Sequence, residues 1–364
     1  MKFMVLFPFF LSFTVQAAIT PLSCIITAVP TLVRLEGLSE RLGDINMACA
    51  GAPGGDVSAV LNIFLPANVT NRVSSGGALD VVMTVDLGSG PVSAGATPRL
   101  MSVSSLVFEN ISFTMPASGT VHLRISNLRV AAGIAGAERP ITAFLSGNGP
   151  SVIQVQNNNP TIGIAHRGLF LGTSSTSIVC TGASLPSVTN FGSLTAFGAR
   201  FFTARVTEGL THAFEKRQPL TDSGVRVILR YSGFPPLARL LVPDVVAGSS
   251  ALEPTSAGDF GLSPKGGKYD PGGTGSLLLA RVQGADSTGT GGAPVFTPGL
   301  PGSGIVWLDL TSDVELTNGS GYVVYEVVDA NPFATESAQI PTFAGIVPVE
   351  QPAVGRLKVT FAPV

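Results

Sequence analysis

Histidines and hydroxyl nucleophiles are the first side chains in this sequence that could do chemistry. The three histidines, His122, His166 and His212, are far apart, and no two stand at a metal-binding spacing such as i and i+4. His122 takes an outward position in an alternating segment, where we expect it to be solvated. The sequence contains no G-x-S-x-G elbow, and Gly266-Gly267-Lys268 lacks the Ser or Thr of a phosphate loop. These residues predict no catalytic, cofactor or metal site.

Carboxylates could hydrolyse a glycosidic bond if the fold brought two of them together. The candidates are Asp309, Asp313, Glu315, Glu326 and Asp329. Acidic residues are sparse, however, with 23 in 364 residues, and the chain has one tryptophan and four tyrosines to form a sugar platform. Trp307 lies in an apolar run, which favours core packing over ligand stacking.

Two further groups of polar residues have open interpretations. Asp286, in the run DSTGTGG, and the segment from Asp309 to Asp313 could bind calcium with other oxygens, but neither matches a known loop spacing. Arg205 and Glu208, in RVTEG, could form a buried pair or a contact site, and a structural salt bridge at a strand end is the simpler interpretation.

The first 17 residues have the pattern of a secretory signal peptide. Lys2 provides a positive start, Phe3 to Val15 an apolar stretch, and Val15-Gln16-Ala17 a small-residue cleavage site. The alternative is a membrane anchor, but an apolar run of this length is shorter than the roughly 20 residues that span a bilayer. We expect cleavage after Ala17 and a secreted or cell-surface protein.

Export would place the three cysteines in an oxidising compartment. Three pairings of Cys24, Cys49 and Cys180 are possible. Cys24 and Cys49 are closest in sequence and lie at the edges of apolar runs, so we favour a disulfide between them. Cys180 would then be a buried free thiol or, alternatively, part of an intermolecular bridge.

The composition is that of a folded protein built from strands. Hydrophobic residues make up 45% of the chain and charged residues only 12%, with 43 glycines and 27 prolines. A net charge of -2 without runs of like charge excludes the electrostatic patterns typical of nucleic-acid or anionic-membrane binding. After signal cleavage no segment is long enough to span a membrane.

Short apolar segments bounded by turn residues continue from about Ser23 to Val364, without helical periodicity. We therefore predict a mostly β protein with two β-sandwich-like domains of antiparallel strands and little helix. The turn-rich segment from Asn157 to Pro160 suggests a boundary near residue 165 between domains 18–165 and 166–364. The second domain would be Ig-like, with long loops at 247–275 and 284–304.

The segment from Leu106 to Val130 predicts a β-hairpin. Folding it about Ser118, with Gly119 as a left-handed residue, brings five apolar pairs opposite each other. These pairs are Met115 with Val121, Phe113 with Leu123, Ile111 with Ile125, Phe108 with Leu128 and Leu106 with Val130. The alternation slips at Glu109-Asn110 and at Ser126-Asn127, where the hairpin would bend or cross between sheets.

Two later segments also alternate clearly. Arg226 and Arg230 separate the apolar residues from Val225 to Tyr231, which predicts a strand with one wet face. The last strand, from Arg356 to Phe361, alternates basic and apolar residues close to the C-terminus. A terminal strand can exchange without threading a loop, so this strand is a candidate for pairing between copies; an ordinary edge strand is the simpler alternative.

Three phrases resemble a known group of proteins: RLEGLSERLGDI (Arg34 to Ile45), RVTEGLTHAF (Arg205 to Phe214) and YEVVDANP (Tyr325 to Pro332). Along most of its length the chain is similar to exported β-rich proteins common in Acidobacteria, for which no activity is known. The resemblance implies a bacterial exported protein and brings no site residues with it.

The sequence favours a binding protein over an enzyme. Our first hypothesis is an extracellular structural or adhesive protein that acts by self-association or by binding a cell-surface partner. The alternative is a secreted hydrolase or carbohydrate-binding protein with a site on the loops of the C-terminal domain. No cofactor is predicted.

Overall fold

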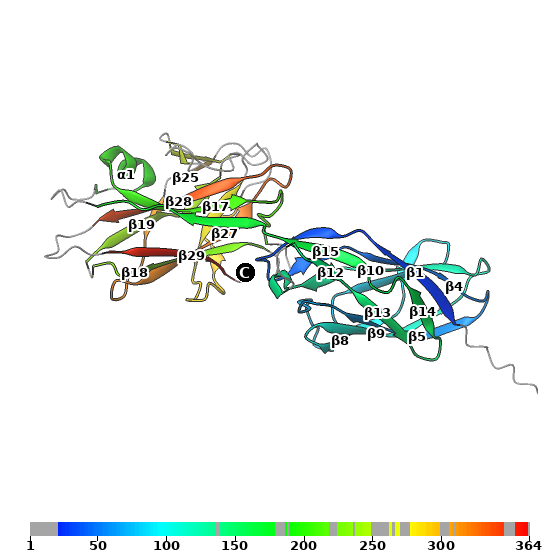
Figure 1. Cartoon of the computed structure of the whole chain (residues 1–364). Helices are drawn as coiled ribbons and strands as arrows, with labels where there is room; N and C mark the ends of the chain where they lie inside the picture. The colour runs from blue at the N-terminus through cyan, green and yellow to red at the C-terminus, as the bar shows by residue number, and fades with distance from the viewer. Residues whose placement is uncertain are drawn as a thin grey trace, which may run out of the picture. The chain divides into compact units, whose positions relative to one another are not determined.

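A computed structural model shows that the protein is mostly β (Figure 1). It describes residues 21–134, 138–178, 186–187, 189–217, 224–235, 237–248, 262–263, 266–269, 277–298, 306–308, 310–345 and 354–362. Within these ranges the chain forms several largely antiparallel sheets and a single short α-helix. The predicted fold class is confirmed. The predicted signal peptide and Cys180 lie outside the described residues.

The chain divides into two compact units. The first contains the residues up to Pro30, Gly43–Leu128 and Thr142–Ile162, and the second contains Thr31–Leu42, Arg129–Ile141 and the residues from Gly163 onward. The chain leaves the first unit for the last time after Ile162, close to the boundary expected near residue 165. Two earlier segments nevertheless belong to the second unit, and no local turn signal marks them.

The first unit consists mainly of two sheets (Figure 1). One has the order β14 (Ile153–Gln156), β1 (Leu22–Ala28), β4 (Ile45–Ala50), β10 (Thr120–Ser126), β6 (Val82–Asp86) and β7 (Pro91–Ser93). The other has the order β13 (Phe144–Asn148), β5 (Asp56–Phe64), β9 (Ser105–Thr114) and β8 (Thr97–Ser102). The pairing of β1 with β14 is parallel, and the other described pairings in these two sheets are antiparallel.

Strict alternation buries one face of the central strands. Buried and exposed residues alternate along β1, β4 and β10 up to the intermediate end residues Ala28 and Ser126, and His122 is among the exposed ones. Cys24 and Cys49 lie opposite each other in the β1–β4 pair, with Cα atoms 4.0 Å apart, and form a disulfide. This is the pair that the sequence favours.

The predicted hairpin is wrong. Strand β9 pairs with β5 and β8, whereas β10 pairs with β4 and β6 in the other sheet, so Phe113 is not the ladder partner of Leu123, nor Phe108 that of Leu128. The apolar residues of β9 and β10 have matching spacings for a different reason. Both strands turn one face toward the interior of the unit, each from its own sheet.

The two slips in the alternation are real irregularities. Glu109 and Asn110 lie opposite the single residue Val60, where the β5–β9 register shifts, and Asn110 has φ +60°. An extra residue with positive φ is characteristic of a β-bulge. Asn127, just after β10, has φ +61°, and Gly119 has φ +66° as expected. The sequence therefore located the irregularities while pairing the strands wrongly.

The second unit is a sandwich of two sheets, each with five strands along its main path. The first is β16 (Leu169–Thr173), β17 (Phe201–Glu208), β28 (Ser337–Gly345), β19 (Arg239–Pro243) and β26 (Thr311–Asp313). The second is β20 (Val245–Ala247), β23 (Leu278–Gln283), β27 (Gly321–Asp329), β18 (Arg226–Ser232) and β29 (Arg356–Ala362), with β24 (Ala293–Pro294) also on β23. Their described pairings are antiparallel.

Smaller elements complete the described chain. Three short strands belong to the second unit: β2 (Thr31–Arg34), β3 (Glu40–Arg41) and β11 (Arg129–Val130). The chain passes between the units within two others, β12 (Pro140–Thr142) and β15 (Thr161–His166). Strands β21 (Leu262–Ser263), β22 (Gly266–Tyr269) and β25 (Val306–Leu308) form a small sheet, and Ala132–Ile134 is a 3-10 turn.

The core of the second unit contains two tyrosines whose hydroxyls bond across the sandwich. Tyr231 lies 2.9 Å from the hydroxyl of Thr342, and Tyr325 donates to the carbonyl of Pro243 at 2.5 Å. Both tyrosines are fully buried, and burial raises the pKa of each phenol above its ordinary value. These bonds fix the two sheets against each other without leaving a buried hydroxyl unsatisfied.

The seven-residue helix α1 (Phe191–Phe197) covers one part of this unit. The Asn190 side chain accepts from the backbone N–H of Ser193 at 2.7 Å, and Gly198 ends the helix with φ +72°. Phe191 packs edge-on against Phe343, with ring centroids 5.5 Å apart. So short a helix has too few turns to show a periodic signal in the sequence.

Strand β18 does not have the wet face that its alternation predicted. The side chain of Arg226 is fully buried, because the loop Gly284–Gly292 covers this face of the sheet. The covering loop is attached through four of its carbonyl groups. They accept from Tyr322 (Ala285 O), Arg230 (Ser287 O) and Arg226 (Gly289 O and Gly291 O). Arg226 here serves as a buried multiple donor, not as a surface charge.

Candidate functional site

The second unit has an open seam where the edges of its two sheets meet. Strand β16 ends one sheet and β29 ends the other, and the two strands lie side by side. We define the seam as Leu169, Phe170 and Leu171 of β16 with Leu357, Val359 and Phe361 of β29. Four of these side chains are only partly buried against the core, and Phe170 is 47% exposed. Apolar side chains on an unpaired edge are a feature of strand-binding surfaces.

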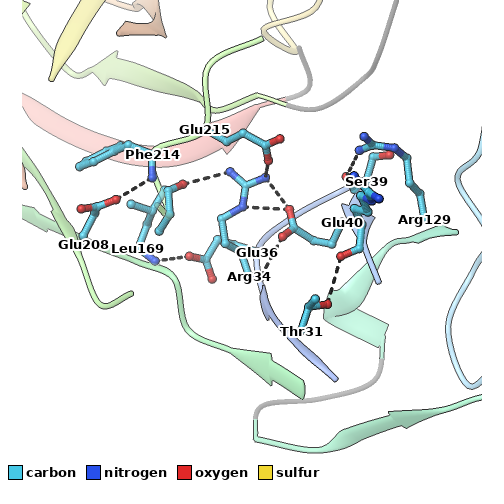
Figure 2. A network of polar contacts seen from close by, with 12 residues as sticks. Thr31, Arg34, Glu36, Ser39, Glu40, Arg129, Leu169, Glu208, Phe214 and Glu215 are labelled. Carbon is cyan, nitrogen blue, oxygen red and sulfur yellow. Dashed lines mark hydrogen bonds and ion pairs between the residues drawn. The ribbon is translucent and has the colours of Figure 1, made fainter. Parts of the chain in front are cut away.

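The segment Thr31–Leu42 lies at one end of the seam and is held by Arg34 (Figure 2). The guanidinium is placed between two carboxylates. Its Nε donates to Glu40 at 2.9 Å, its Nη2 contacts both Glu40 and Glu215, the latter at 3.0 Å, and its Nη1 donates to the carbonyl of Ala213 at 3.1 Å. Every guanidinium nitrogen therefore has a partner, so Arg34 is committed to structure.

Two further contacts fix the same segment (Figure 2). The carboxylate of Glu36 accepts from the backbone N–H of Leu169 at the start of β16, and Arg129 donates to the carbonyl of Ser39 at 3.3 Å. Burial raises the pKa of Glu36, and its hydrogen bonds and the charge of Arg34 act in the opposite direction. Burial by itself would lower the pKa of Arg34, but the neighbouring carboxylates, above all Glu40, raise it.

Glu208 and Glu336 form a second buried group that accepts from backbone. The two oxygens of Glu208 accept from Phe214 N and Glu336 N, both at 2.8 Å. Those of Glu336 accept from Leu277 N at 2.8 Å and Asn331 N at 2.7 Å. Burial, together with the nearby charge of Glu336, raises the pKa of Glu208 to about 7 against the opposing effect of its amide donors.

Two hollows flank the seam. One, of about 280 Å³, is lined by Arg34, Glu36, Leu38, Leu169 and Phe361 among others. The other, of about 450 Å³, is lined by Leu35, Glu36, Arg167, Leu169, Phe170, Leu171 and Phe361. Because Glu36, Leu169 and Phe361 line both, the two hollows are parts of one surface. It is mostly apolar, with single charges at its margin, which suits binding better than bond cleavage.

Three of the candidate catalytic carboxylates are held in separate ion pairs. Each paired acid has its own cation: Asp313 with Arg239 at 2.5 Å, Glu326 with Arg226 at 2.7 Å and Asp329 with Lys216 at 3.3 Å. Glu315 is exposed, and Asp309 lies outside the described residues. Trp307 is in β25, and its side chain also lies outside what the structure describes.

The remaining candidates have structural roles. The carboxylate of Asp286 accepts from the hydroxyl and N–H of Thr288 and from the N–H of Thr290, which lowers its pKa and closes a turn. No ion pair joins Arg205 to Glu208 within the described chain, since Glu208 binds backbone amides instead. The described residues contain no group of three or more His, Cys, Asp or Glu placed to hold a metal ion.

Sequence reasoning missed the networks of Arg34 and of Arg226. The Nη2 atom of Arg226 lies 2.6 Å from Glu326 as an ion pair but makes no well-aligned hydrogen bond there. One signal was available. The phrases RLEGLSERLGDI, RVTEGLTHAF and YEVVDANP supply Arg34, Glu36 and Glu40, then Glu208, Ala213 and Phe214, and then Glu326 and Asn331, so they converge on these contacts.

Comparisons with known proteins add little. No family model matches the chain, and no curated protein matches it. One structural match is reported as the complete structure of manganese lipoxygenase of Gaeumannomyces graminis and partial structure of zonadhesin of Komagataella pastoris, with 13% identity, TM-score 0.25, and 93% of this chain and 98% of that chain covered. Another is the serine-rich repeat adhesion glycoprotein Srr1 from Streptococcus agalactiae, with 11% identity, TM-score 0.21, and coverage of 94% and 92%. Similarity at this level transfers neither fold nor function.

No helix in the described part of the chain has the length and apolar character to cross a membrane.

Proposed function

We propose that this protein acts outside the cell as a structural or adhesive protein, binding or assembling through the open strand edges of its second unit. The observation that carries the proposal is the seam between β16 and β29. It presents strand edges without a ladder partner among the described strands, partly exposed apolar side chains and an adjoining hollow in one place. Strand addition at such an edge gains main-chain hydrogen bonds and buries alternate side chains.

The alternative is a secreted hydrolase or carbohydrate-binding protein. It is less well supported, because the acids that could serve it are distributed among separate ion pairs. The seam also lacks the paired carboxylates that glycoside hydrolysis needs.

The test compares binding with turnover for the mature protein. Association would be followed by light scattering and electron microscopy, and surface binding with glycans and bacterial cells, while hydrolase substrates are screened in parallel. We expect Phe170→Ser to weaken binding or association about five- to tenfold, because the partly exposed ring would be buried in the complex. Phe144→Ser is the matched control, since Phe144 is 42% exposed on an edge strand of the first unit.

A monomeric protein that binds no surface and cleaves a glycan or peptide would contradict the proposal. Equal loss of binding in the two variants would remove the seam as the binding surface.

A further inference from the structure

The edge strand β29 has one basic face. Arg356 and Lys358 are exposed on the outer face of the sheet, and Leu357 between them packs against the core. Arg230 of β18 is the register partner of Lys358, so a third cation stands on the same face. Like charges directly opposite one another in a sheet are destabilising. In the described chain, β29 forms a ladder with β18 alone; β16 of the other sheet lies beside it, but no described strand pairs with its other edge.

The opposite edge of the sandwich has an acidic face. Strand β26 is the last strand of the other sheet and pairs with β19 alone among the described strands. Asp313 is the last residue of β26, and Val314 and Glu315 follow it directly. Asp313 and Glu315 are exposed, and Val314 between them is buried in the core. Asp313 is already held by Arg239, through bonds of 2.5 and 3.0 Å. No ion pair within the described residues involves Glu315, Arg356 or Lys358.

The two edges match in one antiparallel register. It places Arg356 opposite Glu315, Leu357 opposite Val314, and Lys358 opposite Asp313. Because Leu357 and Val314 both face their own cores, extending β26 by two residues to Glu315 would place the charged residues of both segments on the same outer face of a continuous sheet. Opposite charges facing each other across strands contribute roughly 0.2 to 1 kcal/mol for each pair.

We propose that a second copy of this chain is the partner: β26 of one copy adds to β29 of the next. The inference rests on the proposed function and deepens it by identifying the partner. The charges also determine which edges can pair with each other. Pairing β29 with another β29, or β26 with another β26, brings like charges together, and charged edges normally prevent strand pairing for this reason. The remaining arrangement is head to tail, and it leaves a free edge at each end for further growth.

The experiment uses the full mature chain and two charge reversals, Arg356→Glu and Glu315→Arg. Sedimentation velocity and light scattering would be measured over a concentration series at low and high salt. We expect each variant alone to associate at least tenfold more weakly than the unmodified protein, because an attractive pair becomes a repulsive one. Mixing the two variants should restore association to within about twofold, since the reversed edges complement each other. High salt should weaken association of the unmodified protein.

The matched control is Arg200→Glu, which makes the same charge change at an exposed residue that is on neither edge. It should associate like the unmodified protein. Circular dichroism would verify that all variants fold, which is expected because each substituted side chain is exposed.

The proposal is overturned if either reversal leaves association unchanged, or if the mixture fails to recover it. A protein that stays monomeric but binds cells or glycans through Phe170 would also overturn it, while leaving the proposed function in place. Monomeric protein with hydrolase activity and no surface binding would overturn both.

Discussion

Glu208 is a buried carboxyl group whose ionisation affects the stability of the second unit. Its side chain holds the turn that carries Phe214, the residue next to the carbonyl of Ala213 to which Arg34 donates. Burial raises its pKa from 4.5 to about 7, so between these two values the folded protein keeps a proton that the unfolded chain releases. The free energy of unfolding should therefore fall as the pH rises through this window.

Glu208→Gln should remove this pH dependence. A shift of this size corresponds to at most about 3 kcal/mol, since one pKa unit equals about 1.4 kcal/mol. The measurement is hydrogen exchange of β17 and β28 in urea between pH 4.5 and 8. If unmodified and substituted proteins lose stability equally with rising pH, Glu208 is not the titrating group.

Arg226 is a second residue whose removal should have a large effect. Arg226→Ala leaves the buried carboxylate of Glu326 without its cation and frees the carbonyls of Gly289 and Gly291. Breaking a buried pair by removing one partner costs about 3 to 5 kcal/mol. Chemical denaturation gives the loss, and Arg230→Ala on the same strand is the control. Because Arg230 is only partly buried, its loss should be about 1 kcal/mol or less; equal losses would show that Arg226 has no special role.

At the level of the element, the bulge in β9 depends on Asn110. Its φ of +60° lies in the left-handed region that asparagine and glycine tolerate and that alanine does not. Asn110→Ala should lower the stability of the first unit by about 1 kcal/mol, because its Cβ is unfavourable in this region, whereas Asn110→Gly should be close to neutral. Thermal unfolding of the two variants decides this, and a stable alanine variant would mean that the bulge can shift.

Local patterns predicted which residues of a strand are buried but not which strand lies beside it. The apolar alternation of β9 and β10 was read correctly, and Phe108, Ile111 and Leu123 are all buried. Their pairing was wrong because period-two alternation specifies a face, whereas a ladder partner depends on the path of the whole chain. The prediction of a solvent-exposed face on β18 was wrong for a related reason, because the loop that covers Arg226 follows it by about sixty residues in the sequence.

The candidate site was harder to predict than the strands. The exposed charges of β29 and of the segment Asp313 to Glu315 can be read directly from their alternation, but the arrangement of those edges depends on sheet order. The contacts of Arg34 join residues about 180 positions apart, and a sequence without an alignment gives no reason to pair them. The phrases RLEGLSERLGDI, RVTEGLTHAF and YEVVDANP, which contain several of these residues, were the nearest available signal.

At the scale of the whole molecule, the division into units predicts where a substitution acts. Arg34 precedes the expected boundary by more than a hundred residues, yet its partners Ala213 and Glu215 are in the second unit. Arg34→Ala should therefore speed hydrogen exchange in Thr31–Leu42, β16 and β17 and leave β1 and β4 unchanged. The loss should be about 3 to 5 kcal/mol in the second unit, because Glu40 is buried and loses its cation.

Asp44→Ala is the control, because Asp44 pairs with Arg124 inside the first unit. Asp44→Ala should speed hydrogen exchange in β1 and β4 and leave Thr31–Leu42, β16 and β17 unchanged. The effect should be smaller than that of Arg34→Ala, because Arg124 is exposed. Faster exchange in β1 and β4 on replacing Arg34 would contradict the assignment of its segment to the second unit.

The docking of Thr31–Leu42 on the second unit also imposes an order of events during synthesis. The side chain of Arg34 cannot pair with Glu215 until that residue, 181 positions later, has left the ribosome. At roughly 5 to 20 residues per second this takes about 10 to 40 seconds, far longer than a strand or turn needs to form. For that time the segment, and the β16 edge when it follows, stay accessible to other chains. A holding chaperone would therefore have its greatest effect before residue 215 emerges, and slower translation would prolong the exposure.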